Sequence, residues 1–389
     1  MIDKPIGFNE EDDIKVCGVV RDDGACGFYR IRQPIAAVSG KFGIDAALGG
    51  VGCKNSELYQ LLEDCDVAIL PRAASLKMLD LIKVLKAHNP PKKIIIDHDD
   101  NIFSLNPLSP HYQDMGIENI SYVMDGEKIV VWKDGENSFD ITRNIKKTEA
   151  AKECLRIADA VTVTTPELAE YYSQFNKNVI VLPNCIDLSV WKPVRIEKDA
   201  TVRLTWHGGC SHYQDLVEIK PVFEKLAKKN KDLKLQICGQ EFSGIFKNIP
   251  KKQYEFHSWV PTLAHPYKQA LLNNDIAVIP LKDDLFNTCK SAIKWVEYSA
   301  LEIPCVVRNI PPYSKVIEQG VNGFLYNNNE ECESMIQRLI DNPALRRRIG
   351  KQARNYIVEN FDAVERAELW ADALKKVMNH QEEPCLSQP

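Results

Sequence analysis

The sequence predicts an α/β protein made of two doubly wound parallel-sheet domains in series. Short apolar runs alternate with amphipathic helical stretches, which is typical of strands that pair in parallel through helical crossovers. The alternation restarts near the middle of the chain. The length of 389 residues suits two or three domains of ordinary size.

Five apolar runs in the first half predict buried parallel strands, at residues 14–20, 66–70, 93–97, 160–164 and 179–182. Helical patterns occupy 56–64 and 75–88. Thr165 followed by Pro166 predicts a further helix start, because a capping hydroxyl precedes proline at the first helical position.

Six more runs in the second half predict a second sheet, at residues 202–206, 233–238, 254–259, 276–281, 305–307 and 323–326. Residues 329–360 are expected to be helical. We expect a first domain at 1–186, a second at 187–361, and an amphipathic helix at 362–380 that crosses back onto the first domain. Residues 381–389 lack periodicity and are expected to be disordered.

One insertion, at about residues 103–144, interrupts this alternation. Residues 120–131 predict a hairpin with a Met124-Asp125-Gly126-Glu127 turn. An insertion after the carboxyl end of a strand lies where doubly wound folds bind ligands. Acceptor binding, a lid and a structural flap all fit this position.

Composition narrows the class of protein. The net charge of −5 argues against tight, sequence-independent binding to nucleic acid or anionic membranes. The acidic start has no apolar core, and no apolar run reaches the roughly 20 residues of a membrane span. None of the 12 cysteines forms a C-x-x-C pair, which favours reduced thiols and a cytoplasmic protein.

A group of charged residues in the second half suits a nucleotide. Lys290 and Ser291 are expected at a helix start, where free N–H groups and the helix dipole attract phosphate. Lys294 and Glu297 follow at four and seven residues from Lys290, on one helix face. Two cations and an acid in this order suit a pyrophosphate and a ribose, although a solvated charged helix face is the alternative.

The stretch 286–307 carries a specific resemblance. Glu297, Ala300, Pro304, Val306 and Val307 match the end of a motif in retaining GT-B glycosyltransferases of the group 1 type. The resemblance implies two Rossmann-like domains that face a cleft, with Glu297 hydrogen-bonded to the ribose hydroxyls of a nucleotide-sugar.

This stretch also departs from the common form of the motif. Cys289 stands where the superfamily usually has a glutamate over the donor sugar. The Asn-x-x-Lys-Ser-x-x-Lys pattern resembles a sub-branch found in polysaccharide-assembly and phage-encoded enzymes, in which a lysine supports the phosphates.

A glycine loop follows the first predicted strand of each domain. Gly208 and Gly209 allow backbone amides to approach phosphate, and His212 is our candidate for a missing phosphate ligand. Gly27 lies in a loop that resembles the amino-terminal glycine loop of the superfamily. Arg30 either clamps phosphate or forms a surface ion pair.

The polar string after residues 93–97 is expected at the edge of the first sheet. By resemblance His98 lies near the transferred sugar, and Asp99 and Asp100 accompany it as catalytic candidates with Lys290. Carboxylates also ligate Mg²⁺ or Mn²⁺. In a two-domain enzyme of this type helix dipoles and lysines usually replace the metal, so we expect neither a required metal nor a cofactor.

These observations predict a glycosyltransferase that moves a sugar from a UDP- or GDP-sugar to an acceptor hydroxyl. The resemblance implies that the anomeric configuration is retained. Domain closure would bring Arg30 and His98 against Lys290, Ser291 and Lys294. The acceptor, whether carbohydrate, protein or modified nucleobase, stays open. Three alternatives remain: a phage-type enzyme acting on modified DNA bases, a nucleotide-sugar epimerase or hydrolase, and a non-catalytic nucleotide-sugar-binding protein.

Overall fold

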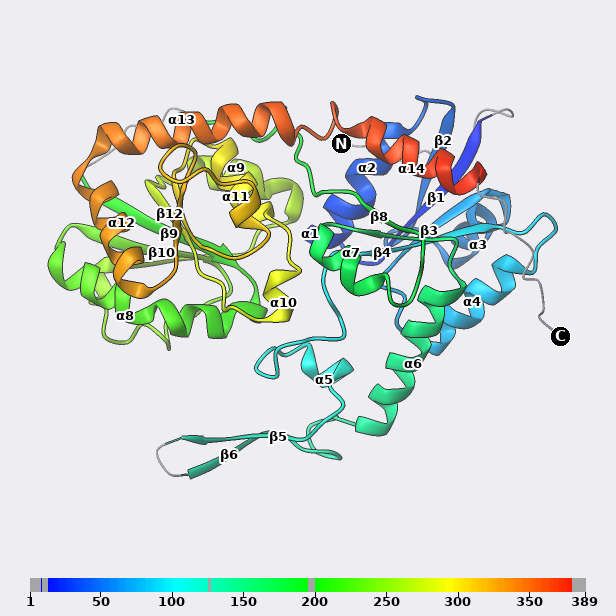
Figure 1. Ribbon diagram of the computed structural model, residues 1–389, viewed down its shortest axis with the longest axis horizontal. Coiled ribbons are helices and arrows are strands. Elements are labelled where there is room, and N and C mark those ends of the chain that lie inside the picture. Colours follow the sequence, from blue (N-terminus) through cyan, green and yellow to red (C-terminus); the bar gives the residue numbers. More distant parts are fainter. Residues whose placement is uncertain (1–7, 9–12, 125–126, 195–199, 380–389) are drawn as a thin grey trace. The chain divides into compact units, whose positions relative to one another are not determined.

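The computed structural model describes residues 8, 13–124, 127–194 and 200–379. The chain divides into two units (Figure 1). Unit 1 comprises residues 1–99, 146–183 and 363–389, and unit 2 comprises residues 100–145 and 184–362. The expected disordered tail at 381–389 lies outside the described residues.

Unit 1 contains a six-stranded, fully parallel sheet in the order β2-β1-β3-β4-β7-β8. Its strands are β1 (Ile14–Val20), β2 (Ile44–Gly50), β3 (Val67–Pro71), β4 (Lys93–His98), β7 (Ala160–Val163) and β8 (Val179–Val181). Five of them confirm the predicted apolar runs. Strand β2 lies outside the predicted runs, because its residues are largely alanine and glycine, types that are depleted in strands.

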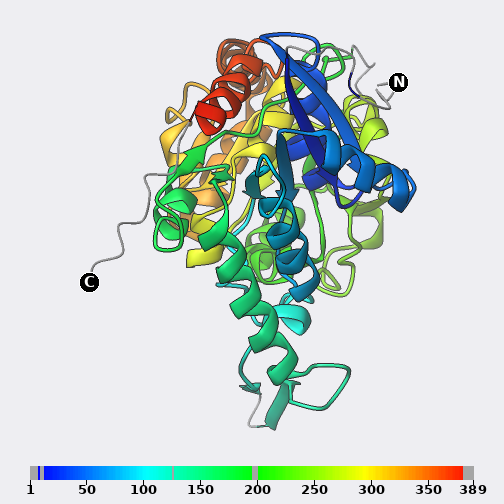
Figure 2. The same cartoon turned by 90° about the vertical axis from the view of Figure 1, so that its right-hand side faces the viewer.

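Helices cover both faces of this sheet. The short helices before β2 are α1 (Ala25–Gly27), the π-helix Phe28–Arg32 and α2 (Gln33–Val38), and the later ones are α3 (Asn55–Asp64), α4 (Leu76–Lys86), α6 (Ile141–Ile157) and α7 (Pro166–Tyr172). Helix α14 (Ala367–Asn379) lies beside α2 in both views (Figures 1 and 2), and its Trp370 and Leu374 belong to the same apolar core as Ile35. Thr165 caps α7, since its hydroxyl accepts a hydrogen bond from the Leu168 amide at 3.2 Å.

Unit 2 contains a second six-stranded parallel sheet, in the order β11-β10-β9-β12-β13-β14. Its strands are β9 (Val202–Gly208), β10 (Leu233–Gly239), β11 (Tyr254–Ser258), β12 (Ile276–Ile279), β13 (Cys305–Arg308) and β14 (Phe324–Tyr326). All six confirm the predicted runs. Read in chain order, this is the 3-2-1-4-5-6 order of a dinucleotide-binding sheet.

The helices of unit 2 are α8 (Tyr213–Lys229), α9 (His265–Leu271), α10 (Leu285–Thr288), α11 (Ile293–Ala300), α12 (Asn329–Asp341) and α13 (Pro343–Asn360). The apolar faces of α8 and α12 pack with the sheet into one core, in which Phe223 of α8 and Ile336 of α12 join Ile237 of β10. No helix among the described residues is both long and apolar enough to cross a membrane.

The insertion after β4 contains α5 (Tyr112–Met115) and the antiparallel hairpin of β5 (Ile120–Met124) and β6 (Glu127–Trp132). The hairpin was predicted; its turn residues 125–126 lie outside the described part. Trp132 donates a hydrogen bond to the Pro107 carbonyl at 2.6 Å and packs against Tyr112 and Phe139. The expected boundary at residue 186 would keep this segment in the first domain, whereas its contacts group residues 100–145 with unit 2.

Candidate functional site

The strand order of the unit 2 sheet reverses at β9. The chain moves from β9 outward to β10 and β11, and then returns to place β12 on the other side of β9. In doubly wound sheets ligands bind outside the carboxyl ends of the strands at such a switch point. The residues that follow β9 and β12 therefore form the candidate site.

The loop after β9 is closely packed. A Cβ on Gly208 would lie 2.6 Å from the Trp206 ring, and a Cβ on Gly239 would lie 2.5 Å from the Gly208 carbonyl oxygen. Gly239 also has φ of +107°, which disfavours other residues. The predicted loop residues Gly208 and Gly209 are thus part of a turn that tolerates no side chain at Gly208.

The two residues of the predicted helix start lie just before the helix. Helix α11 begins at Ile293 with Ala292 as its N-cap, so Lys290 and Ser291 precede it, and only Lys294 and Glu297 share its turns. The Lys290 ammonium lies 3.2 Å from Asp100 and 4.2 Å from the centre of the Phe286 ring. Because the Lys290 side chain is 15% exposed, an anionic ligand can compete with Asp100 for it.

Ser291 and Cys289 differ in their surroundings. The Ser291 hydroxyl accepts a hydrogen bond from the Asn184 side chain at 3.0 Å. Cys289 is fully buried, with its sulfur 3.9 Å from the amide nitrogen of Asn101. The thiol that replaces the usual glutamate is therefore a packed interior group.

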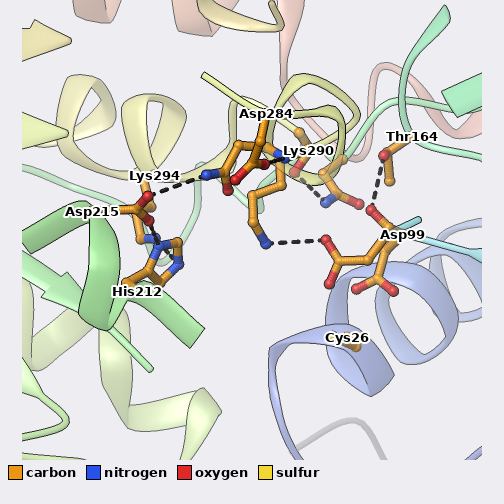
Figure 3. Close-up of polar contacts among 12 residues, drawn as sticks. Cys26, Asp99, Thr164, His212, Asp215, Asp284, Lys290 and Lys294 are labelled. Atoms are coloured by element: carbon orange, nitrogen blue, oxygen red, sulfur yellow. Dashed lines mark hydrogen bonds and ion pairs between the residues drawn. The ribbon is translucent and has the colours of Figure 1, made fainter. Parts of the chain in front are cut away.

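Lys294 and His212 contact each other. The Lys294 ammonium lies 2.6 Å from Nε2 of His212, and Nδ1 of the same ring lies 2.6 Å from Asp215 (Figure 3). Asp215 also accepts hydrogen bonds from the backbone of Lys282 and the side chain of Asn287. The loops after β9 and β12 are joined through this buried network.

Glu297 faces two histidines. Its carboxylate lies 2.8 Å from Nε2 of His207 and 3.9 Å from Nε2 of His265. Burial lowers the pKa of His265 to about 4, so the neutral ring is favoured at neutral pH. These three residues are also the described group that could share a metal ion, since their ligand atoms lie within 4.8 Å of one another.

Arg30, by contrast, belongs to the interior of unit 1. Its side chain is 2% exposed, and its guanidinium donates to both carboxylate oxygens of Asp97, at 3.1 and 2.7 Å, and to the Leu182 carbonyl. Neither sequence interpretation, a phosphate clamp or a surface pair, fits this burial. Three donors are already committed, so we do not propose Arg30 as a phosphate ligand.

The other predicted residues of unit 1 also lie at the carboxyl edge of its sheet. His98 is fully buried, stacks on Tyr172 with ring centres 4.8 Å apart, and has no hydrogen-bond partner for either ring nitrogen among the described residues. Burial, and next the charge of Arg72, lower the pKa of His98 to about 3. The ring is therefore neutral at pH 7.

Asp99 and Gly27 have structural partners. The Asp99 carboxylate pairs with Arg72 at 2.6 Å. Burial alone would raise the pKa of Asp99, but the Arg72 guanidinium and further hydrogen bonds hold it well below its usual range, which makes Asp99 a poor proton acceptor. A Cβ on Gly27 would lie 2.0 Å from the Asp22 carbonyl oxygen, so this glycine is required by a tight turn.

The predicted residues thus fall into two groups. Unit 2 brings together Asp100, Lys290, Ser291, His212, Lys294 and Glu297 with the Gly208-Gly209 loop, whereas Gly27, Arg30, His98 and Asp99 lie in unit 1. Sequence reasoning assigned no role to Asp215, His207 or His265. The first lies three residues after His212, a spacing that places both on one helical turn and was the available signal.

Comparisons with known proteins give a family match in the second half of the chain. The family described as glycosyl transferases group 1 matches residues 205–356, which include the whole α11 region. Glycosyltransferase 1 domain-containing protein 1 of Xenopus tropicalis is 26% identical over 155 residues. That match covers 39% of this chain and 44% of the Xenopus protein, so the chain matches less than half of this relative.

Several solved structures share the fold. Sucrose-phosphate synthase of Thermosynechococcus elongatus has a TM-score of 0.62 at 13% identity, covering 93% of this chain and 98% of that one. Anabaena HepE in complex with UDP-glucose has a TM-score of 0.61 at 11% identity, with coverages of 93% and 99%. TarM has a TM-score of 0.55 at 14% identity, covering 79% of this chain and 54% of TarM. The chain therefore has the GT-B fold, and its residues 205–356 match the family described as glycosyl transferases group 1.

Proposed function

We propose that this protein is a glycosyltransferase that moves a sugar from a nucleoside-diphosphate sugar to an acceptor hydroxyl, with retention of anomeric configuration. The family match over residues 205–356 supports the reaction class. The observation that carries the proposal is the grouping of Lys290, Lys294 and Glu297 at the switch point of the unit 2 sheet.

Each of these side chains suits one part of the donor. The ammonium groups of Lys290 and Lys294 provide positive charge for a diphosphate. The Glu297 carboxylate, seven residues after Lys290 and three after Lys294, can accept hydrogen bonds from ribose hydroxyls. Negative charge grows on the departing diphosphate in the transition state. Cations fixed beforehand stabilise that charge, which lowers the barrier to transfer.

The base of the donor is proposed from similar proteins. HepE has been solved with UDP and with UDP-glucose, and a TarM variant of S. aureus with UDP. We therefore propose a UDP-sugar first and a GDP-sugar second. No metal or cofactor is proposed, because the two lysines supply charge where a metal ion would otherwise neutralise the diphosphate.

An assay of nucleoside-diphosphate release tests this proposal. The protein is incubated with a panel of UDP- and GDP-sugars, with and without mixed carbohydrate, protein and modified-DNA acceptors. Acceptor-dependent release with a glycosylated product supports the proposal, and nuclear magnetic resonance of that product reports its anomeric configuration. Release that needs no acceptor would identify a hydrolase instead. Turnover with no release would indicate an epimerase, and binding without turnover a sensor.

A further inference from the structure

A chain of contacts runs from Asp215 through His212 to Lys294. Asp215 is 3% exposed and its Oδ1 accepts two hydrogen bonds, from the Lys282 amide at 2.8 Å and from the Asn287 side chain at 3.1 Å. Its Oδ2 lies 2.6 Å from Nδ1 of His212. Burial raises the pKa of Asp215 to about 6, so the carboxylate is still mainly anionic above pH 7.

The Asp215 carboxylate determines which ring nitrogen of His212 carries the proton. A carboxylate next to Nδ1 favours the tautomer in which Nδ1 carries the proton, which leaves a lone pair on Nε2. Burial and the neighbouring charges of Lys294 and Lys290 lower the pKa of His212, so its ring does not carry a second proton. Nε2 therefore accepts a hydrogen bond from Lys294 at 2.6 Å. In this tautomer Nε2 of His212 has no proton to donate to a phosphate, and the ring instead supports Lys294.

The charge of Lys294 is influenced by burial, by the cation Lys290 and by nearby carboxylates. Its ammonium lies 5.7 Å from the centre of the Trp206 ring. Burial, and next the charge of Lys290, lower the pKa of Lys294 to about 7. The charged groups around Lys294 and its partner His212 are Lys290, Asp215, Glu297 and Asp100. His207 also faces His212. Asp284 and Lys282 face Asp215.

We propose that Asp215 and His212 are positioning residues that hold Lys294 so that it takes up a proton when the diphosphate of the donor binds. This inference rests on the proposed function, because it assigns the diphosphate to the same site. The proton comes from solvent and forms a new N–H bond at Nζ of Lys294. The diphosphate keeps its own charge and gains an ammonium partner, and no group is oxidised or reduced.

Proton uptake by Lys294 makes the affinity for a nucleoside diphosphate depend on pH. Diphosphate favours the charged amine, so the pKa of Lys294 is higher in the complex than in the free protein. Above pH 7 the free protein has lost this proton and binding must restore it. The affinity for a nucleoside diphosphate therefore falls as pH rises from 7 to 9, approaching tenfold per pH unit for one proton.

Titration calorimetry measures the proton directly. UDP is titrated at pH 8.5, where its terminal phosphate is already ionised, in two buffers with different enthalpies of ionisation. The wild type is expected to take up about one proton per UDP bound, by linkage to an amine that is neutral in the free protein. Lys294→Arg is expected to bind UDP with almost no uptake, because a guanidinium stays protonated. Lys351→Arg, an exposed change on α13, should behave as wild type.

Variants of His212 test the positioning role. His212→Gln keeps an oxygen that can accept a hydrogen bond from Lys294, and is expected to bind UDP within about threefold of wild type. His212→Leu removes the acceptor and is expected to weaken binding about tenfold with an unchanged circular dichroism spectrum. The tenfold loss, about 1.4 kcal/mol, lies near the lower end of the worth of a hydrogen bond to a charged group.

The outcomes separate the two proposals. UDP binding with equal heats in both buffers, or proton uptake that persists in Lys294→Arg, overturns the role of Lys294 and leaves the donor site standing. Equal losses in His212→Gln and His212→Leu overturn the positioning role of His212. If neither UDP nor GDP binds to the wild type, the proposed function and this inference both fail.

Discussion

Charge burial separates the polar residues at the sheet edges into structural groups and ligand-directed groups. Arg30 and Asp97 are each 2% exposed and satisfy each other, so neither can turn to a ligand without leaving a buried charge unpaired. Lys290 is more accessible and pairs with Asp100, itself 25% exposed, while its ammonium also lies over the Phe286 ring. A diphosphate can replace the partly exposed Asp100 carboxylate at small cost.

Removing the charge of Lys290 should therefore weaken the donor site. We expect Lys290→Ala to reduce UDP affinity or turnover by about 10–100-fold, since a hydrogen bond to a charged group is worth roughly 1.5–3 kcal/mol. Calorimetry with UDP and initial rates with the active donor measure this. The exposed Lys351→Ala serves as the control, and wild-type kinetics in Lys290→Ala would remove this lysine from the site.

Burial of His98 should make unit 1 sensitive to acid. The pKa of His98 is lowered to about 3 in the folded protein, against about 6.5 in an unfolded chain. The unfolded state therefore gains a proton first, and the stability is present above pH 6.5 and lost as pH falls toward 3.

We expect this loss to be absent when the ring cannot titrate. His98→Phe keeps an aromatic ring against Tyr172. Between pH 7 and pH 5 the free energy of unfolding should fall by about 2 kcal/mol more in the wild type than in the variant, by proton linkage. Urea unfolding at the two pH values measures the difference. Equal slopes with pH would show that His98 is protonated or solvated in the native state.

At the scale of elements, strands with strong apolar signals were predicted and elements defined by distant contacts were not. The second sheet followed from six apolar runs, all confirmed. Strand β2 was missed because Ala46, Ala47 and the glycines that follow Leu48 carry little strand propensity. The spacing of His212 and Asp215 is a local signal, but the contact of Asp215 with Asn287, 72 residues away, is one that no local pattern encodes.

The β5–β6 hairpin has an exposed apolar surface that the donor site does not use. Tyr122, Val123, Ile129 and Val130 are between 40% and 76% exposed. We propose that this surface binds the acceptor and takes no part in nucleotide binding. Its anchor, Trp132, lies at the base of the hairpin and bonds to Pro107, so the tip can be altered without disturbing the aromatic cluster below.

Replacing residues 121–130 with a short Gly/Ser linker should separate the two activities. We expect UDP affinity to stay within about threefold, roughly 0.7 kcal/mol, while transfer to the acceptor is abolished. Val123→Ser and Val130→Ser are milder variants that keep the hairpin and should reduce transfer in part. Loss of both activities in a folded protein would assign the hairpin to the donor site, and loss of neither would make it a structural flap.

At the scale of the whole molecule, we expect catalysis to proceed without a metal ion. We expect activity to survive exhaustive treatment with EDTA, because Lys290 and Lys294 supply the positive charge at the diphosphate. The measurement compares turnover before and after chelation. Loss of activity that Mn²⁺, Mg²⁺ or Zn²⁺ restores would instead point to His207, His265 and Glu297 as a metal site.

The central claim is that a nucleoside diphosphate binds at the switch point of the unit 2 sheet. A crystal structure of the protein with UDP tests it most directly. We predict diphosphate oxygens within hydrogen-bonding distance of the Lys290 and Lys294 ammonium groups, and ribose hydroxyls on the Glu297 carboxylate. Ordered UDP elsewhere on the protein, with Lys290 still paired to Asp100 and Glu297 still facing His207 and His265, would contradict this placement.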